Sequence, residues 1–251
     1  MTTFILVTAL ASLLIGLSKG GLGGPVPVAM LTPLMSLVIP ASQAVGIVLP
    51  LLIFADVFAL VIYWRKWDPQ RVRLMLPIAI VGVVMGGVLL LLLADSHQDL
   101  VLRRILGLFT LVVAIYKLAS DQMRSLRYQP QNWHGYLAGW AAGFGSALAN
   151  VGAPPFTAYM LLQKVDPTAF IGTTTLFFAI INILKLPFAL MSRNILDIHL
   201  VLNIAWAFLL VPVGVWIGRT FVNRIDPRAF DRLMLALLFI LGLFMLFYTP
   251  A

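Results

Sequence analysis

A lone lysine stands among glycines and prolines at residues 16–27, GLSKGGLGGPVP. The segment lies between two uncharged runs, Met1–Ser18 and Gly20–Ala55. A break in a helix exposes backbone N–H groups at the positive end of the helix dipole, and glycine lets a ligand approach that backbone closely. A lysine beside the break adds a full positive charge. Together these residues have the chemistry of a small anion-binding site.

A second segment repeats this pattern. Residues 135–163 are uncharged and are interrupted by glycine, alanine and proline at 152–155. When Gly24-Pro25-Val26-Pro27 is placed over Gly152-Ala153-Pro154-Pro155, the offset is 128, and Ser18 falls on Ser146. We therefore expect two equivalent helix breaks that together form one site.

Further matches in the same order indicate that the whole chain is an internal repeat. The matched pairs are Gly46 with Gly172, Asp56 with Asn182, Gly82–Gly86 with Gly214–Gly218, and Arg103 with Arg232. The predicted units are residues 1–119 and 135–251, joined by a linker at 120–134.

The elements that position this site are membrane-spanning helices. Of the 251 residues, 61% are hydrophobic and 10% are charged, whereas a soluble domain has about 25% charged residues. The chain is therefore predicted to be an integral membrane protein. Its net charge of +8 lies in short clusters between apolar runs, which argues against a nucleic-acid-binding surface.

Six runs are long enough to cross the bilayer: Val38–Ile62, Leu74–Ala94, Val101–Ala119, Thr168–Ser192, Leu200–Gly218 and Leu233–Ala251. Residues 4–39 and 135–163 each predict a hairpin of two short helices of about 12–15 residues, re-entrant or strongly tilted. The predicted fold is an all-α integral membrane protein with two inverted repeats. Each repeat holds one broken hairpin and three transmembrane helices, giving eight hydrophobic segments and up to ten helices.

The basic residues predict the orientation. Residues 63–73, the linker with Lys117, Lys164 and residues 219–232 together hold twelve of the 17 lysines and arginines. Because basic loops face the cytoplasm, we place these segments inside. Equivalent loops of the two units then lie on opposite sides, and both termini lie outside.

Asp56 is the one acidic residue within a predicted span. Three roles stay open for it: carrying a proton, pairing with Lys19, or capping a wetted helix end. Asn182 is expected to keep the polar contact without titrating. Lys185 lies near the outer end of its span and is expected to extend its ammonium group to the membrane surface.

The residues predicted to bind substrate are Ser18, Lys19, Gly20, Gly21, Gly23, Gly24, Ser146, Asn150, Gly152 and Ala153. Those predicted to couple or line the cavity are Asp56, Asn182, Gly46, Thr173 and Thr174. Structural alternatives stay open: glycines at helix crossings are often packing residues, Ser18 and Ser146 can bond to a carbonyl four residues earlier, and Lys19 can lie at the cytoplasmic surface.

GLSKGGLGGPVPVAMLTPL and AVGIVLPLLIFADVFALVIYWRKWD, with the weaker second copy, resemble the sulfite exporter TauE/SafE family of membrane permeases. The resemblance covers the entire chain. It implies a multi-pass permease of a bacterial or archaeal inner membrane for sulfur-containing anions such as sulfite or organosulfonates. NVGAPP at 150–155 departs from the family pattern, which has more glycine there.

The predicted function is a secondary transporter that moves a small anion by alternating access, with proton coupling possible. No Walker A motif is present, and with no cysteine and one intramembrane acid an enzyme is not expected. No cofactor, metal or nucleic-acid partner is expected. The alternative is a channel-like or structural membrane subunit.

Overall fold

The computed structural model describes residues 2–21, 26–96, 98–122, 131–163, 165–221 and 226–247. All regular elements within these ranges are helices. They are α1 (Thr2–Lys19), α2 (Val26–Met35), α3 (Ala41–Ile62), α4 (Pro69–Asp95), α5 (Asp99–Gln122), α6 (Asn132–Ala149), α7 (Ala153–Leu162), α8 (Pro167–Met191), α9 (Ile198–Asn203), the 3₁₀-helix η2 (Ala205–Leu209), α10 (Leu210–Phe221) and α11 (Pro227–Phe247).

Both predicted hairpins are present, but the expected equal legs of about 12–15 residues are wrong. In each hairpin the first leg has 18 residues and the second has 10. At 1.5 Å per residue, the first legs measure about 27 Å and the second about 15 Å. Each hairpin therefore pairs a helix of nearly full membrane length with a helix of about half that length.

The predicted single span at Leu200–Gly218 is divided into α9, η2 and α10. Pro212 has no N–H with which to bond to the carbonyl of Phe208, and its ring crowds that carbonyl. The preceding turn is correspondingly tightened into 3₁₀ geometry at Ala205–Leu209. This division takes the number of helices beyond the expected ten.

Two long helices begin with the same local signal, an aspartate followed by a proline. The side chain of Asp68 accepts hydrogen bonds from the backbone N–H groups of Gln70 and Arg71 at the start of α4. Asp166 does the same for Thr168 and Ala169 at the start of α8. The aspartate caps the helix and the proline takes the first position, where no N–H is needed, so these boundaries are set locally.

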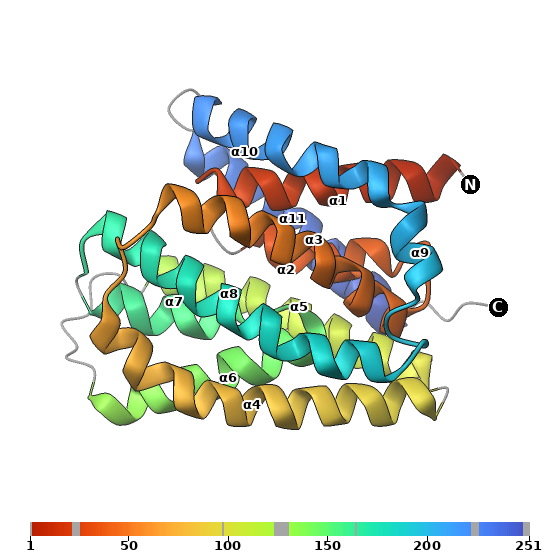
Figure 1. Ribbon diagram of the computed structural model, residues 1–251, viewed down its shortest axis with the longest axis horizontal. Helices are drawn as coiled ribbons and strands as arrows, with labels where there is room; N and C mark the ends of the chain where they lie inside the picture. The colour runs from red at the N-terminus through yellow and green to blue at the C-terminus, as the bar shows by residue number, and fades with distance from the viewer. Residues whose placement is uncertain are drawn as a thin grey trace.

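Glycines allow close contact between helices of the two halves. α1 packs along α10 at one edge of the molecule, and α6 packs along α4 at the opposite edge (Figure 1). A Cβ atom at Gly143 of α6 would overlap the carbonyl oxygen of Ala79 in α4. A Cβ atom at Gly218 of α10 would lie 2.7 Å from the carbonyl oxygen of Leu17 in α1. Small residues at such crossings let helices associate in lipid, where the hydrophobic effect does not hold them together.

The outer surface of the bundle is apolar, as a protein in contact with lipid requires. Large exposed hydrophobic side chains include Val61, Leu92, Met191, Leu209 and Phe247. Within the part of the chain that the structure describes, four helices are long and apolar enough to cross a membrane: Thr2–Lys19, Ala41–Ile62, Pro69–Asp95 and Thr168–Met191. The protein is therefore a multi-pass membrane protein, as its composition predicts.

The α4–α6 crossing makes a testable prediction. Gly143→Leu should lower the free energy of unfolding by about 1–3 kcal/mol or more, because the backbone of α4 leaves no space for the added side chain. Leu137→Phe is the matched control, since Leu137 lies on the same helix and is 56% exposed. Thermal unfolding in detergent measures both variants. Equal melting temperatures for the two would contradict this packing.

Candidate functional site

A cavity of about 160 Å³ lies between the two helix breaks. Residues at the ends of α1 and α6, including Lys19 and Ser146, line it together with the start of α7 and one side of α8. Its polar lining consists mainly of Ser18, Lys19, Ser146, Asn150, Thr157, Thr174, Thr175 and Asn182, and its apolar lining includes Val28, Leu52, Phe170, Ile171 and Phe178. The cavity therefore offers polar groups and apolar side chains to the same ligand.

An ion pair stands beside this cavity. The ammonium group of Lys19, in the last turn of α1, donates to Oδ1 of Asp56 in α3. The second carboxylate oxygen of Asp56 accepts a hydrogen bond of 2.6 Å from Nδ2 of Asn182 in α8. Asp56 is only 2% exposed, so both of its oxygens have partners within the protein. Of the roles left open for Asp56, the structure shows the pairing with Lys19.

Lys185 is a buried lysine, and its hydrogen-bond partners are neutral. Its ammonium group donates to Oδ1 of Asn150 at 2.7 Å, and to the carbonyl oxygen and Oγ of Ser146 at 3.2 Å each. Lys185 is 5% exposed. The expectation that it extends to the membrane surface is therefore wrong. The last turn of α6 offers carbonyl and side-chain oxygens nearer than the surface, and the ammonium group bonds to these.

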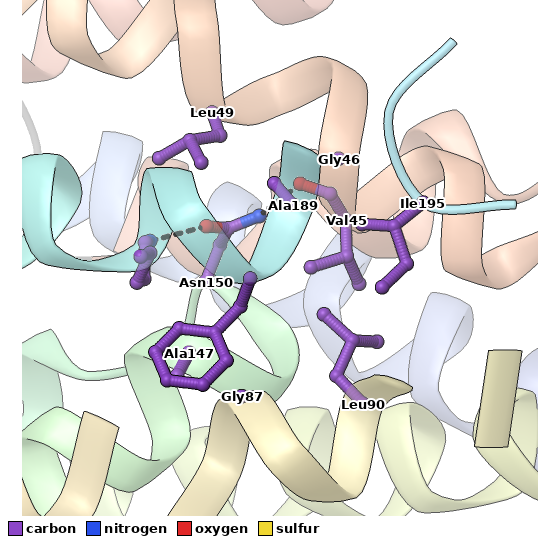
Figure 2. A pocket seen from close by; sticks show the side chains of 11 residues that line it. Val45, Gly46, Leu49, Gly87, Leu90, Ala147, Asn150, Ala189 and Ile195 are labelled. Carbon is purple, nitrogen blue, oxygen red and sulfur yellow. Dashed lines mark hydrogen bonds between the residues drawn. The ribbon is translucent and has the colours of Figure 1, made fainter. Parts of the chain in front are cut away.

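Asn150 connects the second helix break to the first half of the chain. It ends α6 with a positive φ of 58°, a left-handed conformation that asparagine tolerates. Its Nδ2 donates to the carbonyl oxygen of Val45 in α3 at 3.0 Å and to Oγ1 of Thr32 in α2 at 3.1 Å. Figure 2 shows the Asn150 amide between α3 and α8, enclosed by apolar side chains. Every polar atom of this side chain is thus held in place.

Asn150 separates two spaces of different size, and Lys185 lies on the side of the smaller one. Asn150 lines the cavity of about 160 Å³ on one side. On the other side, both residues line a pocket of about 10 Å³ with Gly46, Leu90 and Ile195 (Figure 2). The small pocket has room for at most about one water molecule. The larger cavity extends toward Phe170 and Ile171 at the start of α8.

The predicted site residues fall into three groups. Those that line the larger cavity are Ser18, Lys19, Gly21, Ser146, Asn150, Gly152, Ala153, Thr174 and Asn182, and Asp56 lies directly behind it. Those that the structure uses in packing instead are Gly20, Gly46 and Thr173. Gly23 and Gly24 lie outside the described residues.

The three packing residues have specific partners. A Cβ atom at Gly20 would lie 2.5 Å from the carbonyl oxygen of Val215 in α10. One at Gly46 would overlap the carbonyl oxygen of Ile195. Oγ1 of Thr173 accepts from the backbone N–H of Asp68 at 2.8 Å. These residues hold helices and loops together and do not face the cavity.

Backbone N–H groups are fewer at the second break than the sequence analysis expects. α7 begins at Ala153, and its next two residues are Pro154 and Pro155, which carry no N–H. A proline suits a helix start, but two of them remove two of the donors that an anion would use. The positive charge near the cavity therefore comes mainly from lysine side chains.

The main residue that the sequence analysis missed is Lys185. One signal was present: Lys185 follows Asn182 by three residues, which places the two side chains on one face of α8. Since Asn182 was predicted to line the cavity, Lys185 could have been placed on the same side.

The Lys19–Asp56 pair generates a double-mutant prediction. Lys19→Met should destabilise the protein more than Asp56→Asn, because it leaves a buried carboxylate without its counter-charge, whereas Lys19 still faces the cavity. The double variant should be more stable than the two single effects predict, with a coupling of about 0.5–3 kcal/mol. Thermal unfolding of the four proteins measures this, and additive effects would contradict a working ion pair.

One comparison with known proteins gave a family match. The family model for the sulfite exporter TauE/SafE family matches residues 6–245. Comparisons with curated proteins and with solved structures gave no match. The family match covers nearly the whole chain, including both helix breaks and the helices that carry Asp56 and Lys185. The protein is therefore a member of the TauE/SafE family.

Proposed function

We propose that this protein is a secondary transporter for small sulfur-containing anions such as sulfite or organosulfonates. It carries them across a bacterial or archaeal inner membrane by alternating access. Family membership supports the transported class, because the family is described as a sulfite exporter family. The observation that carries the proposal is Lys185, a cation buried beside a cavity with only neutral oxygens as described partners.

Burial of such a cation is costly unless a charge compensates it. An ionised group taken out of water loses several kcal/mol of solvation, and neutral hydrogen bonds restore only part of this. An anion in the cavity would supply the missing charge by replacing Asn150 or Ser146 as an acceptor. Lys19 lines the same cavity and would attract the anion from its other side.

The two unequal spaces support alternating access. The cavity extends toward the start of α8, and the α3–α4 loop next to this end carries basic residues that predict the cytoplasmic side. On the far side of Lys185 the pocket is nearly closed, with Gly46 against Ile195. This arrangement corresponds to an inward-facing state, in which Asn150 lines both spaces and accepts a hydrogen bond from the ammonium group of Lys185.

The inverted repeat remains part of the proposal, with units 1–119 and 135–251. Three features support it. α1 packs along α10, and its equivalent α6 packs along α4. The loop after α3 packs on Gly172 through Lys66, and the loop after α8 packs on Gly46 through Ile195. These two loops lie at opposite ends of the molecule, as equivalent loops of inverted units should (Figure 1). The start of α1 and the end of α11 lie at the same end of the molecule.

A transport assay tests the function. Proteoliposomes with the wild-type protein should take up labelled sulfite or methanesulfonate with saturation, and Lys185→Met should lose most of this flux. The variant should be at least as stable as the wild type, because it removes an uncompensated buried charge. Lys66→Met is the matched control, since the Lys66 side chain is exposed. Absence of saturable flux in the wild type would instead favour a channel-like or structural subunit.

Cysteine labelling tests the orientation. The chain has no cysteine, so an introduced one is the only thiol. Arg193→Cys, after α8, should react with an impermeant thiol reagent added outside intact cells. Lys66→Cys, after α3, should react only when the membrane is opened. Labelling of both positions from the same side would contradict inverted units.

A further inference from the structure

The charges around the cavity are few enough to be counted. Among the described residues, Lys19 and Lys185 each contribute one positive charge when protonated, and Asp56 contributes one negative charge. Arg103 is buried as well, but it packs over the ring of Phe244 and lines neither the cavity nor the small pocket. Each break places one helix C-terminus beside one helix N-terminus, so the two partial charges of about one half largely cancel. The site therefore carries one excess positive charge.

We propose that this site selects its substrate by charge: it accepts monovalent anions and discriminates against divalent ones, and Asp56 sets this limit. This inference rests on the proposed function and adds to it the charge that the substrate must carry. A monovalent anion brings the buried groups to neutrality. A divalent anion leaves one excess negative charge in a region that lipid and apolar side chains surround, where an unbalanced charge is strongly unfavourable.

Asp56 is placed to enforce this rule because it is fixed and buried. Asn182 holds one carboxylate oxygen at 2.6 Å, and Lys19 holds the other. The carboxylate therefore neutralises one of the two lysine charges before any ligand binds. Without it, the site would carry two positive charges and match a divalent anion.

The apolar part of the cavity agrees with a ligand that carries a single charged group. Leu52, Phe170 and Phe178 line it beside the polar residues. These side chains offer no donors to a second charged group. They would pack against the apolar substituent of an organic anion. A small anion without such a substituent would direct its single charge at the lysines.

Methanesulfonate and sulfate test the proposal, because they have nearly the same tetrahedral shape and carry one and two negative charges. Calorimetric titration of the purified full-length protein uses chloride-free buffer at one mildly acidic pH, at which sulfate is still a dianion, so that both ligands meet the same protein. The wild type should bind methanesulfonate at least about tenfold more tightly. Equal binding, or tighter binding of the dianion, would overturn the inference while leaving the transporter proposal intact. Absence of binding by either ligand would instead remove the proposed function.

Two variants address Asp56 directly. Asp56→Asn should reverse the preference, with the affinity for sulfate rising by about tenfold or more. Asp56→Glu keeps the charge and should keep the preference for methanesulfonate. An unchanged preference in Asp56→Asn would show that Asp56 does not set the limit. If Asp56→Asn does not fold, the wild-type comparison of the two ligands decides the proposal by itself.

Discussion

The burial of charge within an apolar bundle is the constraint on which the rest of this structure depends. Lys19, Asp56 and Lys185 lie on helices that lipid surrounds, and each must find partners inside the protein. Asp56 is satisfied by Lys19 and Asn182. Lys185 is satisfied in hydrogen bonds but not in charge, since Asn150 and Ser146 offer it neutral oxygens. This difference is the reason why we propose that Lys185, and not the Lys19–Asp56 pair, meets the ligand.

The helix breaks make this arrangement possible. A continuous helix would have no free carbonyl groups at this depth, but α6 ends at Ala149 and presents its last turn to Lys185. The turn at Asn150 then bonds to α2 and α3, so the end of the hairpin is fixed to the opposite half of the chain. Close glycine contacts between α4 and α6 hold the long leg of the same hairpin. The proposed binding site and the packing of the bundle therefore use the same two hairpins.

Much of this organisation could be predicted from the sequence, and the misses have physical causes. Long apolar runs indicated most helices, because this signal is local. Pairing of Asp56 with Lys19 was one of the roles left open, and Asn182 was assigned to the site as the repeat equivalent of Asp56. The burial of the Lys185 side chain was not expected, because it depends on where the end of α6 lies relative to α8. Gly20 was assigned to the site, yet its role is decided by α10, about 195 residues away in the sequence.

A structure with a bound ligand would test the role of Lys185 most directly. Crystals of the full-length protein grown with bromomethanesulfonate, a monovalent sulfonate with an anomalous scatterer, would locate the anion. We expect bromine density in the cavity lined by Asn182 and Phe178, with a sulfonate oxygen replacing Asn150 or Ser146 at the ammonium group of Lys185. Density elsewhere, with Lys185 still bonded to Asn150 and Ser146, would show that this lysine serves only to hold the end of α6.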